Sequence, residues 1–154
     1  MKTLFVLTTI VLTSFLSFSQ EKSIKNKLDN SIRNWTELKS FDQVSIDFKF
    51  EDCDASMGYD KEVIQLKITN KTSEKITMTW HMWLYFNGVC KTCDYPQEYT
   101  YTLNLEPNQT LEGDCSLNSD NRLSIFSKFN DSRYTGGSYL TDFDMHNMKI
   151  TSIK

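Results

Sequence analysis

The sequence contains few of the residues that several common kinds of functional site require. Its 154 residues include only 5 Gly, 2 Pro and 2 His. Few glycines leave little material for a glycine-rich phosphate loop, and two histidines leave little for a histidine-based active site. Fibrous and low-complexity chains are excluded as well, because they depend on abundant Gly or Pro. The composition predicts one globular domain that is long enough to bury a core.

The chain also lacks an excess of basic residues and a long apolar run. It has 17 Lys and Arg against 20 Asp and Glu, a net charge of -3 at pH 7. A nucleic-acid partner requires a basic face that releases counterions from phosphates, so we predict no such partner. The apolar stretch from Leu4 to Leu16 is interrupted by Thr and Ser. It is shorter than the about 20 residues of a membrane span, so we predict that the protein does not span a membrane.

The first nineteen residues have the pattern of a signal peptide. Lys2 precedes the apolar stretch, and Ser17-Phe18-Ser19 places small residues at the positions required for cleavage before Gln20. An uncleaved anchor is the alternative. We therefore predict a signal peptide over residues 1–19 and a secreted or periplasmic mature protein. Such compartments are oxidising and favour disulfides over free thiols.

A helical pattern follows the predicted cleavage site. Ile24, Leu28, Ile32 and Trp35 recur at spacings of four, four and three, which places them on one face of a helix. We predict a short N-terminal amphipathic helix over residues 20–34 that packs on the protein's own domain. Docking on a membrane surface is the alternative.

From residue 35 onward, apolar residues alternate with polar ones at a period of two. Such alternation is typical of strands that bury one face. The predicted strands cover residues 44–50, 64–68, 76–86, 99–105, 109–113, 123–129 and 140–153. A change of parity in the last strand predicts a bulge at His146-Asn147. We predict an all-β fold over residues 35–154, an antiparallel immunoglobulin-like β-sandwich of about seven strands, with a small closed barrel as the alternative.

Several short motifs follow one another in a recognisable order. A Trp-containing strand precedes Cys90-Lys91-Thr92-Cys93, and Leu103-Asn104-Leu105-Glu106-Pro107, Gly113-Asp114-Cys115 and Ser124-Ile125-Phe126-Ser127-Lys128 come after it. This order, over roughly residues 35 to 153, resembles small secreted β-sandwich proteins of Gram-negative bacteria that have no assigned activity. The resemblance implies a fold and a compartment, and it carries over no catalytic residue.

The four cysteines give the most specific signal in the sequence. If the strands form a meander, Cys53, Cys90, Cys93 and Cys115 all lie at one end of the sandwich. Three disulfide pairings are possible. We favour Cys90 with Cys93 and Cys53 with Cys115, and the second bond could contribute about 4 kcal/mol of stability by loop entropy. A four-thiolate zinc site and a redox-active C-x-x-C are the alternatives, and an oxidising compartment argues against zinc.

Acidic residues and histidines offer weaker signals. The first long loop carries Glu51, Asp52, Asp54, Asp60 and Glu62. Oxygen-rich loops can bind calcium, but these residues lack a regular ligand spacing, so a solvated acidic loop is favoured. Neither His81 nor His146 has a nucleophile at a recognisable spacing. We predict no enzyme, no metal and no cofactor. A small hydrolase or a zinc-dependent module is the alternative, since paired acids for glycoside hydrolysis meet only in three dimensions.

The third strand carries aromatic residues of both parities. If Trp80, Met82, Leu84 and Phe86 point into the core, His81, Trp83 and Tyr85 point outward. Exposed aromatic side chains can stack on sugar rings or anchor a protein partner. The alternative is that the predicted N-terminal helix covers them. We predict a monomeric, non-enzymatic module that binds a protein or a glycan through Trp83, Tyr85 and His81.

Overall fold

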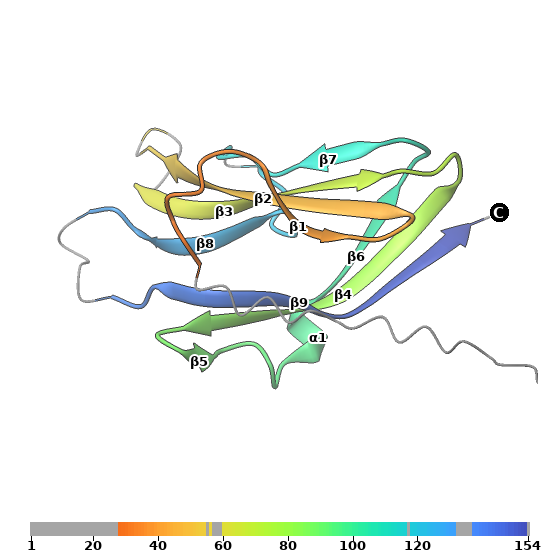
Figure 1. The fold of residues 1–154 in the computed structure, drawn as a ribbon. Coiled ribbons are helices and arrows are strands. Elements are labelled where there is room, and N and C mark those ends of the chain that lie inside the picture. The colour runs from red at the N-terminus through yellow and green to blue at the C-terminus, as the bar shows by residue number, and fades with distance from the viewer. Residues whose placement is uncertain (1–27, 55, 57–59, 117, 132–136, 154) are drawn as a thin grey trace, which may run out of the picture.

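The computed structural model describes residues 28–54, 56, 60–116, 118–131 and 137–153 (Figure 1). The predicted signal peptide and residues 20–27 of the predicted helix lie outside the described residues. The described chain consists mostly of strands, with one short helix, α1 (Pro96–Tyr99). The strands are β1 (Thr36–Ser40), β2 (Val44–Cys53), β3 (Lys61–Asn70), β4 (Lys75–Phe86), β5 (Val89–Cys90), β6 (Thr100–Leu105), β7 (Thr110–Glu112), β8 (Ser124–Phe129) and β9 (Leu140–Ile153).

The strands form two antiparallel sheets stacked face to face (Figure 1). In the five-stranded sheet β1, β2, β3 and β7 are neighbours in that order, and β8 also pairs with β3. In the four-stranded sheet β4 lies between β9 on one side and β5 and β6 on the other. The predicted antiparallel β-sandwich is therefore confirmed.

All seven predicted strands are present, and two short ones were not predicted. β1 has the sequence TELKS, whose single apolar residue, Leu38, gives no alternating pattern, and its pairing with β2 shifts register between Glu37 and Lys39. β5 has only two residues. The predicted bulge in β9 is confirmed, because the pairing with β4 shifts between Thr79 and His81, and Asn147 has a φ of 51°.

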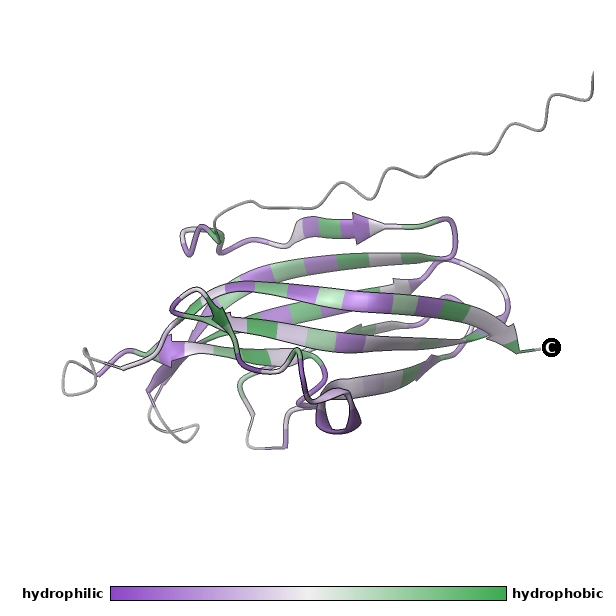
Figure 2. Ribbon diagram, turned by 90° about the horizontal axis from the view of Figure 1, so that it is seen from below, coloured by the Kyte–Doolittle hydropathy of each residue, from purple (hydrophilic) through white to green (hydrophobic). Residues whose placement is uncertain are grey.

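The alternating pattern of the long strands builds the core between the sheets. Figure 2, seen from the side of the four-stranded sheet, shows hydrophobic and hydrophilic residues alternating along the strands. β2 contributes Val44 and Ile46, and β4 contributes Ile76, Met78 and Trp80; all five are 0% exposed. Burial of such side chains stabilises the fold by about 1.5–3 kcal/mol each.

Two cations join the sheets along their long edges. On one side, Lys39 of β1 donates a hydrogen bond of 2.9 Å to Asp144 of β9. On the other side, Arg122 donates a hydrogen bond of 2.6 Å from Nη1 to the carbonyl oxygen of Thr102 in β6. Asp120 holds Arg122 in place with two hydrogen bonds to Nε and one to Nη2. Each tie satisfies a polar group at the border of the sandwich.

The described part of the predicted N-terminal helix is not helical. Residues 28–34 form a turn and then run beside β2, where the carbonyl oxygen of Ile32 accepts a hydrogen bond of 2.8 Å from the Phe50 amide. Leu28 and Ile32 pack against the core. Leu28 and Ile32 therefore reach the core without forming a helix. The edge of β2 supplies the backbone hydrogen bond that holds this segment.

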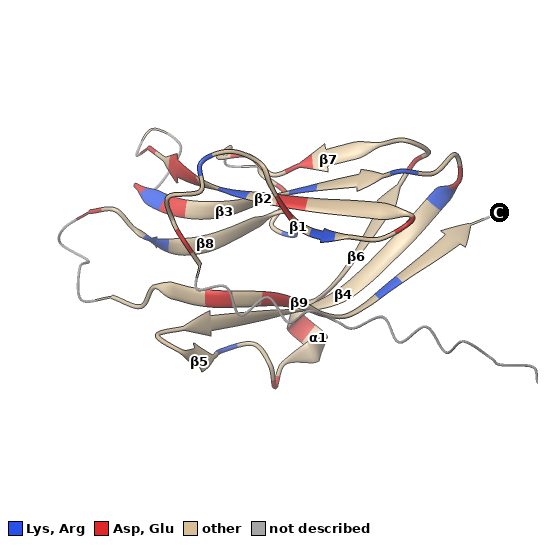
Figure 3. Cartoon of the chain, in the orientation of Figure 1, with Lys and Arg blue, Asp and Glu red and all other residues tan. Residues whose placement is uncertain are grey.

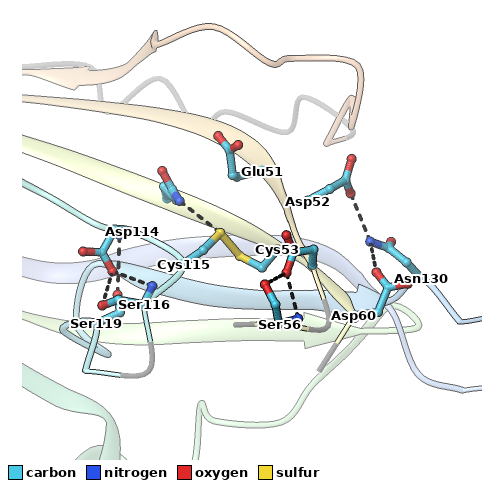
Figure 4. The surroundings of a disulfide bond; sticks show 12 residues. Glu51, Asp52, Cys53, Ser56, Asp60, Asp114, Cys115, Ser116, Ser119 and Asn130 are labelled. Carbon is cyan, nitrogen blue, oxygen red and sulfur yellow. Dashed lines mark hydrogen bonds between the residues drawn. A yellow bond between two sulfur atoms is a disulfide. The ribbon is translucent and has the colours of Figure 1, made fainter. Parts of the chain in front are cut away.

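The structure joins Cys53 to Cys115 and Cys90 to Cys93, the two pairs favoured from the sequence. The two bonds lie beside different sheets. Cys53–Cys115 lies beside the five-stranded sheet, where Gln65 is 3.7 Å from Cys115 Sγ (Figure 4). Cys90–Cys93 belongs to the loop after β4, in the other sheet. Because every cysteine is in a disulfide, no thiolate remains for zinc in this structure.

Candidate functional site

The outward side of the four-stranded sheet carries the residues predicted to bind a partner. Trp80 and Met82 of β4 are buried in the core, so His81, Trp83 and Tyr85 occupy the opposite side of the strand. The register pairs them with His146, Asp144 and Asp142 of β9. We call these six residues the Trp83 face: His81, Trp83, Tyr85, Asp142, Asp144 and His146.

His81 is held in a single tautomer by two hydrogen bonds. Its Nδ1 accepts a hydrogen bond of 3.1 Å from Trp83 Nε1, so the ring proton resides on Nε2. Nε2 lies 3.0 Å from the Thr92 carbonyl oxygen and donates to it. The side chain is only 9% exposed. Both nitrogens are thus occupied within the protein, and neither offers a lone pair to a substrate proton.

Thr92 fills a gap along the edge of β4. The pairing of β4 with β6 ends at His81, and its pairing with β5 begins at Tyr85. Between them, Thr92 Oγ1 accepts from the Leu84 amide at 2.8 Å and donates to the Met82 carbonyl at 2.7 Å. These bonds satisfy buried backbone groups that no strand reaches. Thr92 lies between Cys90 and Cys93, so the disulfide closes the loop that presents it.

The Trp83 ring is fixed by its neighbours. It stacks on His146 with a centroid separation of 3.6 Å and an interplanar angle of 15°, and His81 meets it edge-on. Asp144 Oδ2 lies 3.6 Å from His146 Nδ1, while Asp144 Oδ1 accepts from Lys39. Trp83 and Tyr85 remain partly exposed. The arrangement presents an oriented aromatic side chain beside charged groups.

Asp142 is under electrostatic strain on this face. Burial raises the pKa of its carboxyl group above the usual range, and the charge of Asp144 raises it further. A hydrogen bond of 2.8 Å from the Phe143 amide partly opposes this shift. Figure 3 shows acidic residues on β9, beside β4. The ionised form of Asp142 therefore carries a cost in the folded protein, a common property of functional residues.

The acidic loop of the sequence analysis does not converge on a cation site. Asn130 donates to Asp52 at 3.2 Å and to Asp60 at 3.1 Å, whereas Glu51 pairs with Lys49 and points away from them (Figure 4). Glu62 is 1% exposed and is held by Arg33, Ser127 and Lys128. Among the described residues, no group of three or more His, Cys, Asp or Glu could hold a metal ion.

Sequence reasoning missed several residues of the site. Asp142 and Asp144 alternate with the buried Phe143 and Met145, a pattern that could have placed them on the outward side. No sequence pattern identifies Lys39 or Thr92 as part of the site, because their roles depend on contacts with other segments of the chain. Trp35 lies over the five-stranded sheet, with Lys67 Nζ 4.5 Å and Lys49 Nζ 5.0 Å from its ring centroid. Each sheet thus carries one tryptophan on its outward side.

Comparisons with known proteins leave this site to be interpreted from its own geometry. No protein-family model, curated protein or solved structure matches the chain. In the part of the chain that the structure describes, no helix has the length and apolar character needed to cross a membrane.

Proposed function

We propose that the protein is an exported, non-enzymatic binding module that holds a glycan or a protein partner on the Trp83 face. One observation carries this proposal: a partly exposed tryptophan is fixed in orientation by a hydrogen bond to His81 and a stack on His146. Pre-organised aromatic groups bind at a low entropic cost, because they lose little freedom on association.

A glycan is the ligand class that the face suits better. Tyr85, Asp142 and Asp144 surround Trp83 with one hydroxyl and two carboxylates, which can bond to sugar hydroxyls while the indole stacks on a ring. A protein-binding centre more often has aromatic anchors and few charged groups. Here two acids lie directly opposite the aromatic residues of β4.

Export is supported by the disulfides, which are compatible with an oxidising compartment. The immunoglobulin-like assignment belongs to the same proposal. It is supported by the path of the chain, which passes from the five-stranded sheet to the four-stranded sheet after β3, returns after β6 and crosses again after β8. Such crossings between stacked sheets are typical of Greek-key sandwiches.

The test of the binding proposal is a glycan array probed with the labelled mature chain and two matched variants. We expect the wild type to bind a subset of glycans, Trp83→Ala to lose that signal, and Trp35→Ala, which removes the tryptophan of the other sheet, to retain it. Binding that survives Trp83→Ala would contradict the assignment of this face. Absence of glycan binding, together with a Trp83-dependent complex with a purified protein, would identify a protein partner instead.

Glycoside hydrolysis is the second candidate, and Asp142 is the observation that favours it. Its raised pKa beside an Asp144 that is paired with Lys39 resembles the acid and base of a glycosidase, whose carboxyl groups differ in proton affinity. Mass spectrometry of glycans incubated with the protein distinguishes the two candidates. Shortened products that disappear with Asp142→Asn would favour hydrolysis, whereas intact glycans would favour binding alone.

A further inference from the structure

The two disulfides differ in how far they are built into the sandwich. Cys53 is 1% exposed at the end of β2, and its partner follows β7 at a sequence separation of 62. Cys90 and Cys93 are both partly exposed, and only three positions separate them. Breaking the first bond releases a constraint on much of the chain, whereas breaking the second frees only a local loop. The Cys90–Cys93 bond can therefore open while the sandwich stays folded.

The surroundings of Cys90 and Cys93 favour nucleophilic attack on one sulfur. The amide of Cys93 lies 3.1 Å from Cys90 Sγ and donates toward it. Such a donor stabilises a thiolate, so Cys90 is the better leaving group and Cys93 Sγ is the sulfur that is attacked. The Tyr85 hydroxyl lies 4.0 Å from Cys93 Sγ, close enough to approach the second thiolate once it forms.

The loop closed by this bond is connected to Trp83 through hydrogen bonds. Thr92, between the two cysteines, is anchored to β4 through its hydroxyl and accepts from His81 through its carbonyl. His81 in turn accepts from Trp83 Nε1. The bonds form one continuous chain from the disulfide loop through Thr92 and His81 to Trp83. Each link joins adjacent groups, so the loop and the indole are in continuous physical contact.

We propose that Cys90–Cys93 is a reversible thiol–disulfide exchange site for a dithiol reductant, and that opening it releases the hold of Thr92 on His81 and Trp83. This inference goes beyond the proposed function, because it concerns the state of the protein without any ligand. Cys53–Cys115 stays closed in the same reaction.

The exchange proceeds in two balanced steps. A thiolate of the reductant attacks Cys93 Sγ and forms a mixed disulfide, while the bond between the two cysteine sulfurs breaks and its electron pair passes to Cys90 Sγ. The second thiolate of the reductant then attacks the reductant sulfur of the mixed disulfide and displaces Cys93 as a thiolate. The reductant leaves as its own internal disulfide. Two electrons have passed to the protein, and the new thiolates take protons from water.

The site is tested by equilibrating the folded mature chain with dithiothreitol buffers of increasing reducing strength. Free thiols are then trapped by alkylation and assigned by peptide mass spectrometry. We expect half-reduction of Cys90–Cys93 at a ratio of reduced to oxidised dithiothreitol at least about tenfold lower than that for Cys53–Cys115, a difference of about 30 mV. Simultaneous reduction of both bonds, or reduction of Cys53–Cys115 first, would overturn the proposal.

The coupling to Trp83 is tested by the NMR signals of the three indole N–H groups under the same buffers. Selective reduction should shift the Trp83 signal, while that of Trp80 in the core stays within its line width. The Cys90→Ser/Cys93→Ser variant should show the same shift of the Trp83 signal without reductant. Thr92→Val keeps the disulfide but loses both hydroxyl bonds, so it should show this shift as well. Thr92→Ser, which keeps the hydroxyl group, should retain the wild-type signal. A Trp83 signal that is unchanged by reduction and by the double serine variant would refute the coupling.

Discussion

Among the single residues of the Trp83 face, Asp142 is the one whose folded surroundings disfavour its ionised form. It stands opposite Tyr85 in the register, and its raised pKa arises first from burial and then from the charge of Asp144. A carboxyl group whose pKa is raised by folding stabilises the folded state at pH values below its unfolded pKa. That contribution is lost as the pH rises through the folded pKa. At neutral pH the ionised group is therefore a cost.

We predict that Asp142→Asn increases the free energy of unfolding at pH 7. The amide removes the charge and keeps an oxygen that can accept from the Phe143 amide. The advantage should shrink as the pH falls through the folded pKa of the wild-type group, and it should vanish below the ordinary value of 3.8. Urea unfolding of both proteins between pH 2.5 and pH 7 measures this difference. A lower free energy of unfolding for Asp142→Asn than for the wild type at pH 7 would contradict the cost assigned to the ionised carboxyl group. Asp144→Asn is the matched control: it loses the hydrogen bond from Lys39, so we expect it to lower the free energy of unfolding.

Part of the Trp83 face could be predicted from the sequence. The period of two correctly placed His81 and Trp83 opposite Trp80 and Met82, because adjacent residues of a strand face opposite sides. It could not show that His81 is covered by Thr92, which is eleven positions away and belongs to a loop. Nor could it show the stack on His146, because the pairing of β4 with β9 joins segments far apart in the chain.

At the scale of elements, the segment before β8 closes one border of the sandwich. Arg122 reaches the carbonyl oxygen of Thr102 in β6, and Asp120 fixes the guanidinium with three hydrogen bonds. The hydrogen bond from Arg122 lowers the pKa of Asp120, and burial only partly opposes the shift. A carboxyl group with a lowered pKa contributes stability above its unfolded pKa, and that contribution is lost as the pH falls through the folded value.

We predict that acidification removes more stability from the wild type than from Asp120→Asn. The wild type should lose the Asp120 contribution as the pH falls below the ordinary value of 3.8, whereas the amide has no charge to lose. Thermal unfolding of both proteins at pH 6 and at pH 2.5 measures how much stability each one loses on acidification. Equal losses in both proteins would show that this carboxyl group does not hold Arg122 in solution. Lys39→Met, at the other border of the sandwich, serves as a comparison that leaves Asp120 intact.

The strands differ in how far their sequences reveal them. β2 and β4 could be predicted because apolar and polar residues alternate along Val44 to Phe50 and along Lys75 to Met82. β1 could not, since its bulge and its charged residues break the alternation, and its pairing with β2 creates the strand. The predicted N-terminal helix illustrates the reverse case. Leu28 and Ile32 have helical spacing, but in the structure both pack on the core and the Ile32 carbonyl accepts from the Phe50 amide, because tertiary contacts override a weak helical preference.

For the whole molecule, the two disulfides contribute unequally to stability. The Cys53–Cys115 bond closes a loop that spans both sheets, with a sequence separation of 62, whereas Cys90–Cys93 spans three positions. In the chain-entropy description the longer loop loses more freedom in the unfolded state. Their pairing followed from the expected ends of the strands. The sequence could not show that the two bonds lie beside different sheets, because this depends on where the chain crosses from one layer to the other.

We predict that Cys53→Ala/Cys115→Ala lowers the free energy of unfolding by about 2–5 kcal/mol, the usual cost of losing a disulfide that closes a long loop. Cys90→Ala/Cys93→Ala should cost less than half as much, because the constraint is local. Guanidinium unfolding of the two double variants beside the wild type measures both values. A larger loss for the Cys90/Cys93 variant would reverse the roles assigned to the two bonds.

The most direct test of the Trp83 face is a calorimetric titration with the glycan that gives the strongest array signal. Wild type, Trp83→Phe, Trp83→Ala and Trp35→Ala are titrated under one set of conditions. We predict that Trp83→Ala weakens binding at least about tenfold, equivalent to about 1.4 kcal/mol, that Trp83→Phe lies between it and the wild type, and that Trp35→Ala stays within about twofold of the wild type. Equal affinities of Trp83→Ala and the wild type, or a larger loss in Trp35→Ala, would contradict the account.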